Sequence, residues 1–183
     1  MRRVHVLIGC LFLFLAPGLR AQTPAPQIRT KSCHDFVQGF YDWYVHETFR
    51  TLKDGEGADA YGQVLKNRGA AFSPGLLRAL REDQEAQAKV SGEIVGLDFD
   101  PFLASQDPSK HFVVGKITFK GNQCFADVHG TSYGTNGEHV LPELTRKNGR
   151  WVFVNFHYPD FSPDENLIDL LKMLKADREK SSK

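Results

Sequence analysis

An acidic segment in the middle of the chain carries the first residues whose types and spacing suggest chemistry. Asp98, Asp100 and Asp107 lie in the stretch IVGLDFDPFLASQDP, which covers residues 94–108. Carboxylates at alternate positions can share a hard cation, but an EF-hand loop also needs a glycine and a closing glutamate at fixed positions that this segment lacks. Two interpretations remain: aspartates that cap backbone groups in turns, or a ligand, metal or partner-binding segment that includes Gln106.

Three histidines, His129, His139 and His157, lie on segments that we expect to be strands. Neighbouring strands would bring two of them within reach of Glu143. Zinc sites usually have closer pairing, such as two histidines four apart on a helix, so the spacing predicts no metal site. His157 with its neighbour Asn155 is instead a weak candidate for general acid–base catalysis.

Aromatic residues are dense in three segments of the chain, 36–44, 99–102 and 151–156. Most of them are expected in the core. Trp43, Tyr44 and Trp151 are candidates to line an amphipathic cavity beside His157, which would suit an apolar ligand or a peptide.

The segment Trp151–Tyr158 is apolar on both faces, which predicts a strand in the middle of a sheet. Asn148-Gly149 before it favours a type I′ hairpin turn, and Pro142 indicates a bulge or an edge. Turn residues divide the preceding region into three more strands, which predicts a four-stranded antiparallel meander over 111–119, 123–133, 138–147 and 150–158.

Helical periodicity precedes and follows this meander. It predicts three helices before the meander, over 33–49 (starting after Ser32), over about 61–68 and over 74–91. A last helix is predicted to start at the cap signature of Ser162–Glu165 and to end near Asp177. The fold class is therefore α+β, with N-terminal helices packed on a curved, cone-like sheet and a C-terminal helix. This order of elements resembles the cystatin-like fold shared by nuclear transport factor 2 and steroid isomerases, which implies a pocket at the open end of the sheet.

The chain begins with a short positive region and an apolar run, which is typical of a secretory signal peptide over residues 1–21, cut after Ala21. Cys10 as a lipid-bearing residue is an alternative. Residues 22–31 are expected to be a flexible lead-in, 32–177 a single domain, and 178–183 a frayed tail. The run is too short to span a membrane, so the mature protein is expected in the periplasm or outside the cell.

Cys33 and Cys124 remain after cleavage of the leader. An oxidising compartment favours a disulfide between them, and two separate buried thiols are the alternative. The leader holds three of the 23 basic residues and none of the 22 acidic ones, so the mature domain is slightly acidic. Such a balance argues against nucleic acid as a partner.

Three stretches resemble a family of secreted bacterial proteins known as domain of unknown function 3828. They are the aromatic helix FVQGFYDWYV, the segment LDFDPFLASQDP and the closing WVFVNFHYPD followed by NLIDLLKMLK. The resemblance implies a cone-like α+β fold and an envelope location, and it supplies no catalytic residues. The chain departs from the lipoprotein members because it lacks a convincing lipid-bearing cysteine.

Together these observations predict a non-enzymatic binding domain for an envelope protein or peptide, without a cofactor and with homodimerisation possible. The alternative is a small-molecule carrier or a hydrolase-like or isomerase-like enzyme, with Asn155 and His157 at the mouth of a pocket.

Overall fold

The computed structural model describes residues 26–54, 59–132 and 135–181 of the 183-residue chain. The predicted signal peptide lies outside the described residues. The elements are α1 (Pro26–Asp54), α2 (Ala60–Asn67), the 3₁₀ helix η1 (Gly69–Ala71), α3 (Pro74–Gln87), β1 (Phe112–Lys120), β2 (Gln123–Ser132), β3 (Thr135–Lys147), β4 (Arg150–His157) and α4 (Leu167–Ser181). The strands form an antiparallel sheet in the order β1-β2-β3-β4. The predicted α+β class is confirmed.

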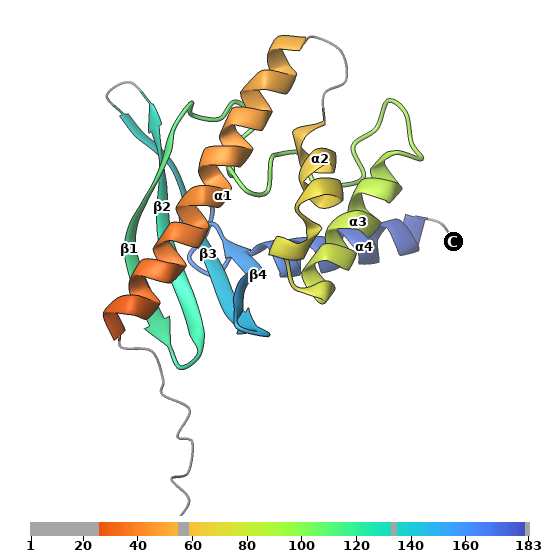
Figure 1. Cartoon of the computed structure of the whole chain (residues 1–183). Coiled ribbons are helices and arrows are strands. Elements are labelled where there is room, and N and C mark those ends of the chain that lie inside the picture. The colour runs from red at the N-terminus through yellow and green to blue at the C-terminus, as the bar shows by residue number, and fades with distance from the viewer. Residues whose placement is uncertain (1–25, 55–58, 133–134, 182–183) are drawn as a thin grey trace, which may run out of the picture.

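Helix α1 crosses one face of the sheet, and α2, α3 and α4 gather beside β4 (Figure 1). The strand β4 lies at the edge of the sheet, so the prediction of a central strand was wrong. Phe72 forms a parallel bridge with Phe153, and the Ser73 N–H donates to the Phe153 carbonyl at 2.8 Å. The burial of β4 on both faces therefore comes from the helical layer and from this added segment.

Helix α1 begins at Pro26, inside the predicted lead-in, and it runs past Phe49. Proline suits a first helical turn because its missing N–H is not needed there. Ser32 does not cap the helix as predicted, since its hydroxyl donates to the Arg29 carbonyl one turn earlier. The Arg29 guanidinium lies 4.6 Å from the centre of the Phe119 ring, so the first turn is tied to the sheet.

Helix α4 begins at Leu167 and not at the predicted Ser162. The side-chain oxygen of Asn166 accepts the backbone N–H three residues later, which is the bond of an N-cap. The helix also continues beyond its predicted end and into the expected tail. Arg178 holds that last turn because its guanidinium donates to the buried Asp83 carboxylate at 2.7 Å.

Two local predictions in the meander are confirmed. Asn148 and Gly149 both have positive φ, 51° and 79°, as a type I′ turn requires. The register between β3 and β4 shifts between Glu143 and Leu144, directly after Pro142. The proline therefore lies beside a bulge in an interior strand.

The predicted disulfide between Cys33 and Cys124 is present, and it joins α1 to β2. Both cysteines are fully buried in the layer between α1 and the sheet. This layer is mainly aromatic. Near the centre of the layer, the ring centroids of Phe40 and Phe153 lie 4.8 Å apart.

The other face of β1, β2 and β3 is open. Residues of β1 alternate, with Phe112 4% exposed, Val113 52% and Val114 5%. Direct strand partners point to the same face of a sheet, so the register defines what we call the open sheet face. It includes Val113, Phe125, Asp127, His129, His139, Leu141, Glu143 and His157, while Asn155, the partner of Glu143, is covered by the start of α4.

Candidate functional site

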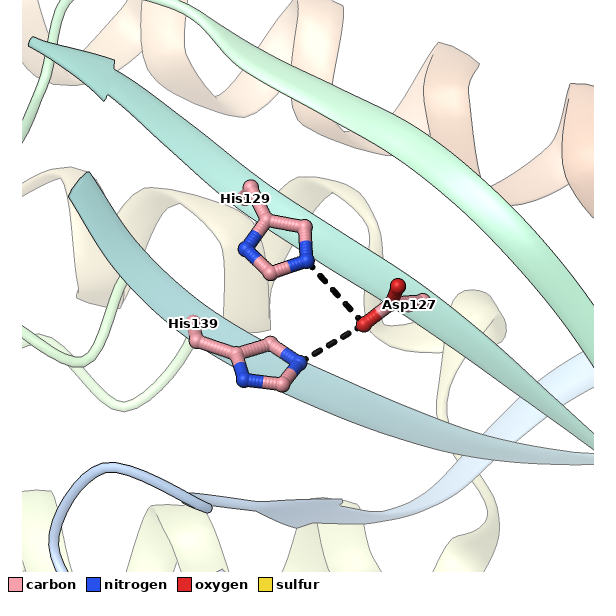
Figure 2. Close-up of side chains that lie close together, drawn as sticks. All are labelled: Asp127, His129 and His139. Atoms are coloured by element: carbon pink, nitrogen blue, oxygen red, sulfur yellow. Dashed lines mark hydrogen bonds and ion pairs between the residues drawn. The ribbon is translucent and has the colours of Figure 1, made fainter. Parts of the chain in front are cut away.

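A cluster of Asp127, His129 and His139 lies on the open sheet face (Figure 2). His129 and His139 are direct partners in the β2–β3 ladder, and their rings stack with centroids 4.3 Å apart. Both rings aim one nitrogen at the same carboxylate oxygen. The distances from Asp127 Oδ1 are 2.7 Å to His139 Nε2 and 3.2 Å to His129 Nε2. These groups can share a proton or hold a cation.

Two effects act on the pKa of the Asp127 carboxyl. Burial raises it, but hydrogen bonds from His139 and His129 lower it, and the net pKa falls below its usual range. The carboxylate therefore stays charged at neutral pH and can act as an acceptor or a ligand.

Sequence reasoning missed Asp127 and expected two of the three histidines within reach of Glu143. The structure brings only His157 to Glu143, with Nε2 and Oε2 3.0 Å apart. A signal for the true cluster was present. Alternate residues share one strand face, and the hairpin register between β2 and β3 places His139 opposite His129.

Asn155 and His157 do not converge on one reacting position. The Asn155 amide is 9% exposed. It donates to Asn166 and accepts the Ile168 N–H, so it supports the start of α4. His157 is partly buried, and its ring lies 6.0 Å from that of Phe125. Their predicted catalytic role gains no support from these contacts.

The predicted acidic segment lines a groove of about 410 Å³ that contains Asp98, Asp100 and Gln106 together with Tyr61. Asp107 does not contribute to the lining. Asp98, Gln106 and Asp107 are exposed, and the Gln106 amide donates to the Asp98 carbonyl at 2.8 Å.

Asp100 is bonded within the fold. Its Oδ1 accepts the N–H groups of Phe102 and Leu103, and its Oδ2 accepts the Tyr44 hydroxyl at 2.6 Å. Burial raises the pKa of Asp100 to about 6, although these three hydrogen bonds act to lower it. The geometry favours the turn interpretation for this residue.

The raised pKa of Asp100 predicts a dependence of stability on pH. Burial favours the neutral Asp100 carboxyl in the folded state. Asp100 therefore makes its full contribution to the free energy of unfolding below the usual pKa of 3.8, and this contribution is lost as the pH rises through about 6. We expect wild type to lose up to about 3 kcal/mol of unfolding free energy, relative to Asp100→Asn, between pH 4 and 7.5. Urea unfolding at several pH values measures this difference. The Asp98→Asn variant is the control and should follow wild type. A constant gap between wild type and Asp100→Asn would contradict the prediction.

The structure does not gather the predicted aromatic residues around one cavity. Trp151 donates its indole N–H to Ser32 near the start of α1. Tyr44 lies twelve residues further along that helix, about 18 Å away at the rise of an α-helix. The Arg68 guanidinium stacks on the Trp43 ring, with its carbon 4.5 Å from the ring centre. A shared cavity with His157 would need these distant groups to meet.

Within the described residues, no helix is both long and apolar enough to cross a membrane. No protein-family model matches the chain, so the resemblance to domain of unknown function 3828 stays a prediction. No curated protein matches either.

Two solved structures are similar to this chain. One is a chain of the type VI native effector–immunity complex Tae3–Tai3 from Ralstonia pickettii, at 20% identity and a TM-score of 0.50, over 69% of this chain and 94% of that chain. The other belongs to the selenomethionine form of the same complex, at 18% identity and a TM-score of 0.46, over 69% and 96% of the two chains. The first likeness establishes a shared fold.

Proposed function

We propose that this protein binds a protein partner in the cell envelope, as one member of an effector–immunity pair. The observation that carries the proposal is the fold shared with a chain of the Tae3–Tai3 effector–immunity complex, which extends over 94% of that chain. The disulfide between Cys33 and Cys124 is consistent with an oxidising compartment outside the cytoplasm. The predicted signal peptide would deliver the protein there.

The open sheet face is our candidate for the binding surface. Its exposed Val113 and partly exposed Phe125 and Leu141 provide apolar area beside charged and imidazole groups. Mixed surfaces of this kind are typical of protein interfaces, which place apolar and aromatic side chains within a polar rim. The exposed residues of the acidic segment are a second proposed contact.

Photo-crosslinking tests this assignment. A benzophenone amino acid is placed at Val113 in one variant and at Met173 on α4 in another, since these residues are 52% and 53% exposed. The variants are produced in the native envelope and irradiated. We expect position 113 to capture one protein that position 173 does not capture.

The captured protein must then form a 1:1 complex with this protein when both are purified. We expect Val113→Arg to weaken that complex at least about tenfold, because it places a charge in the interface, while Met173→Arg leaves it unchanged. One of the two proteins should also arrest growth when it is produced alone in the envelope, and coproduction of the other should restore growth. Capture of a second copy only, or equal binding by Val113→Arg, would contradict the proposal.

A further inference from the structure

We propose that Asp127, His129 and His139 bind a divalent transition-metal ion such as Zn²⁺, in preference to Mg²⁺ or Ca²⁺. Within the described part of the chain, these three residues offer one donor atom each, and the donors lie within 4.8 Å of one another. Two imidazole nitrogens and one carboxylate oxygen form a ligand set that zinc accepts with a fourth position open. This inference does not depend on the proposed function.

The sheet itself positions the donors. Asp127 and His129 are two residues apart on β2, so they share a face, and His139 lies directly across the ladder from His129. His129 also pairs with Val113 of β1, so the ladders hold its backbone from both sides. Figure 2 shows both imidazole rings turned toward the Asp127 carboxylate.

Two of the three donor spacings are close to those around zinc, and the third, between the two imidazole nitrogens, lies within 4.8 Å. Bonds of about 2.0–2.1 Å in a tetrahedron place donors about 3.3 Å apart. His129 Nε2 already lies 3.2 Å from Asp127 Oδ1, and the 2.7 Å contact of His139 must widen by roughly half an ångström. The side chains can move this far because they are 23% to 48% exposed. The same exposure leaves room for a fourth ligand from water or from a partner.

A neighbouring carboxylate supports the His139 tautomer that remains once a metal ion replaces the Nε2 proton that Asp127 accepts. His139 Nδ1 faces Asp160 Oδ1 at 3.9 Å. A proton on Nδ1 directed at that carboxylate leaves the Nε2 lone pair for a metal, as in the carboxylate–histidine pairs around zinc. The donor set also selects among metals. Mg²⁺ and Ca²⁺ prefer oxygen ligands alone, whereas imidazole suits zinc and its neighbours.

Calorimetric titration tests the site on the untagged mature protein after treatment with EDTA. At pH 7.5 we expect one Zn²⁺ per chain, and no saturable binding of Mg²⁺. His129→Gln and His139→Gln should each weaken Zn²⁺ binding at least about 100-fold, because each removes one of three ligands. His157→Gln is the matched control on the same face, and its affinity should equal that of wild type.

Thermal unfolding provides a second readout that does not rely on heats of binding. Added Zn²⁺ should raise the Tm of wild type and of His157→Gln, but not that of His139→Gln, because only a folded site with all its ligands binds tightly. Lowering the pH to 5.5 should weaken binding, since protons compete for the imidazoles. The proposal is overturned by an absence of saturable Zn²⁺ binding, by unchanged binding in both glutamine variants of the cluster, or by equal binding of Mg²⁺.

Discussion

Replacement of both Cys33 and Cys124 by alanine lowers the free energy of unfolding by about 4–5 kcal/mol, the largest effect that we expect from one local change. The bridge spans 91 residues of sequence, so its loss gives the unfolded chain many more conformations. Alanine keeps the β-carbon of each buried cysteine, so only the two sulfur atoms are removed from the layer between α1 and β2. Urea unfolding of the mature protein under oxidising conditions measures the difference.

Reduction of the wild-type protein is the matched control for this experiment. Reduced wild type should unfold near the midpoint of the Cys33→Ala/Cys124→Ala variant, and the variant should not respond to reductant. A loss below about 1 kcal/mol would contradict the entropic argument, because the chain-entropy model assigns several times that amount to a loop of this length.

Replacement of Phe102 by alanine should cost about 3–5 kcal/mol of unfolding free energy. Phe102 is fully buried, and its backbone carbonyl accepts the hydroxyl of Tyr41 at 2.9 Å. Its ring lies within 6 Å of five other aromatic rings, which belong to Phe40, Tyr44, Tyr61, Phe72 and Phe156. The substitution would leave a cavity among rigid rings that cannot collapse into it.

Phe161→Ala is the matched control for Phe102. Phe161 also belongs to a connecting segment and also contacts aromatic rings, those of Phe99 and Tyr158, but it is 48% exposed. We expect it to cost less than half as much as Phe102→Ala. Chemical denaturation of both variants checks the ranking, and equal losses would show that Phe102 is not a centre of the core.

Local sequence determined most of the elements. Apolar periodicity and turn residues predicted all four strands, and Asn148-Gly149 identified a turn whose positive φ values the structure confirms. Such signals are local, because the side chains of one element and the backbone of one turn are sufficient to produce them. The disulfide was also predictable, since two cysteines allow a single pairing.

Only the tertiary structure decided how these elements are used. The strand β4 lies at an edge of the sheet, although its composition is that of a central strand. It can be apolar on both faces because the helical layer and the segment at Phe72 cover it. Phe102 lies in a segment without any period, and its central position depends on rings from four separate parts of the chain. Contacts of this kind join residues that are distant in sequence, so no local pattern contains them.

The candidate metal site also depends partly on local sequence and partly on tertiary structure. The sequence by itself determined that Asp127 and His129 share a strand face, because side chains alternate along a strand. The register of the β2–β3 hairpin decided that His139 lies opposite His129 and that His157 pairs with Glu143 instead. A shift of one residue in that register would move the imidazole of His139 to the buried face, since side chains in a strand repeat every second residue.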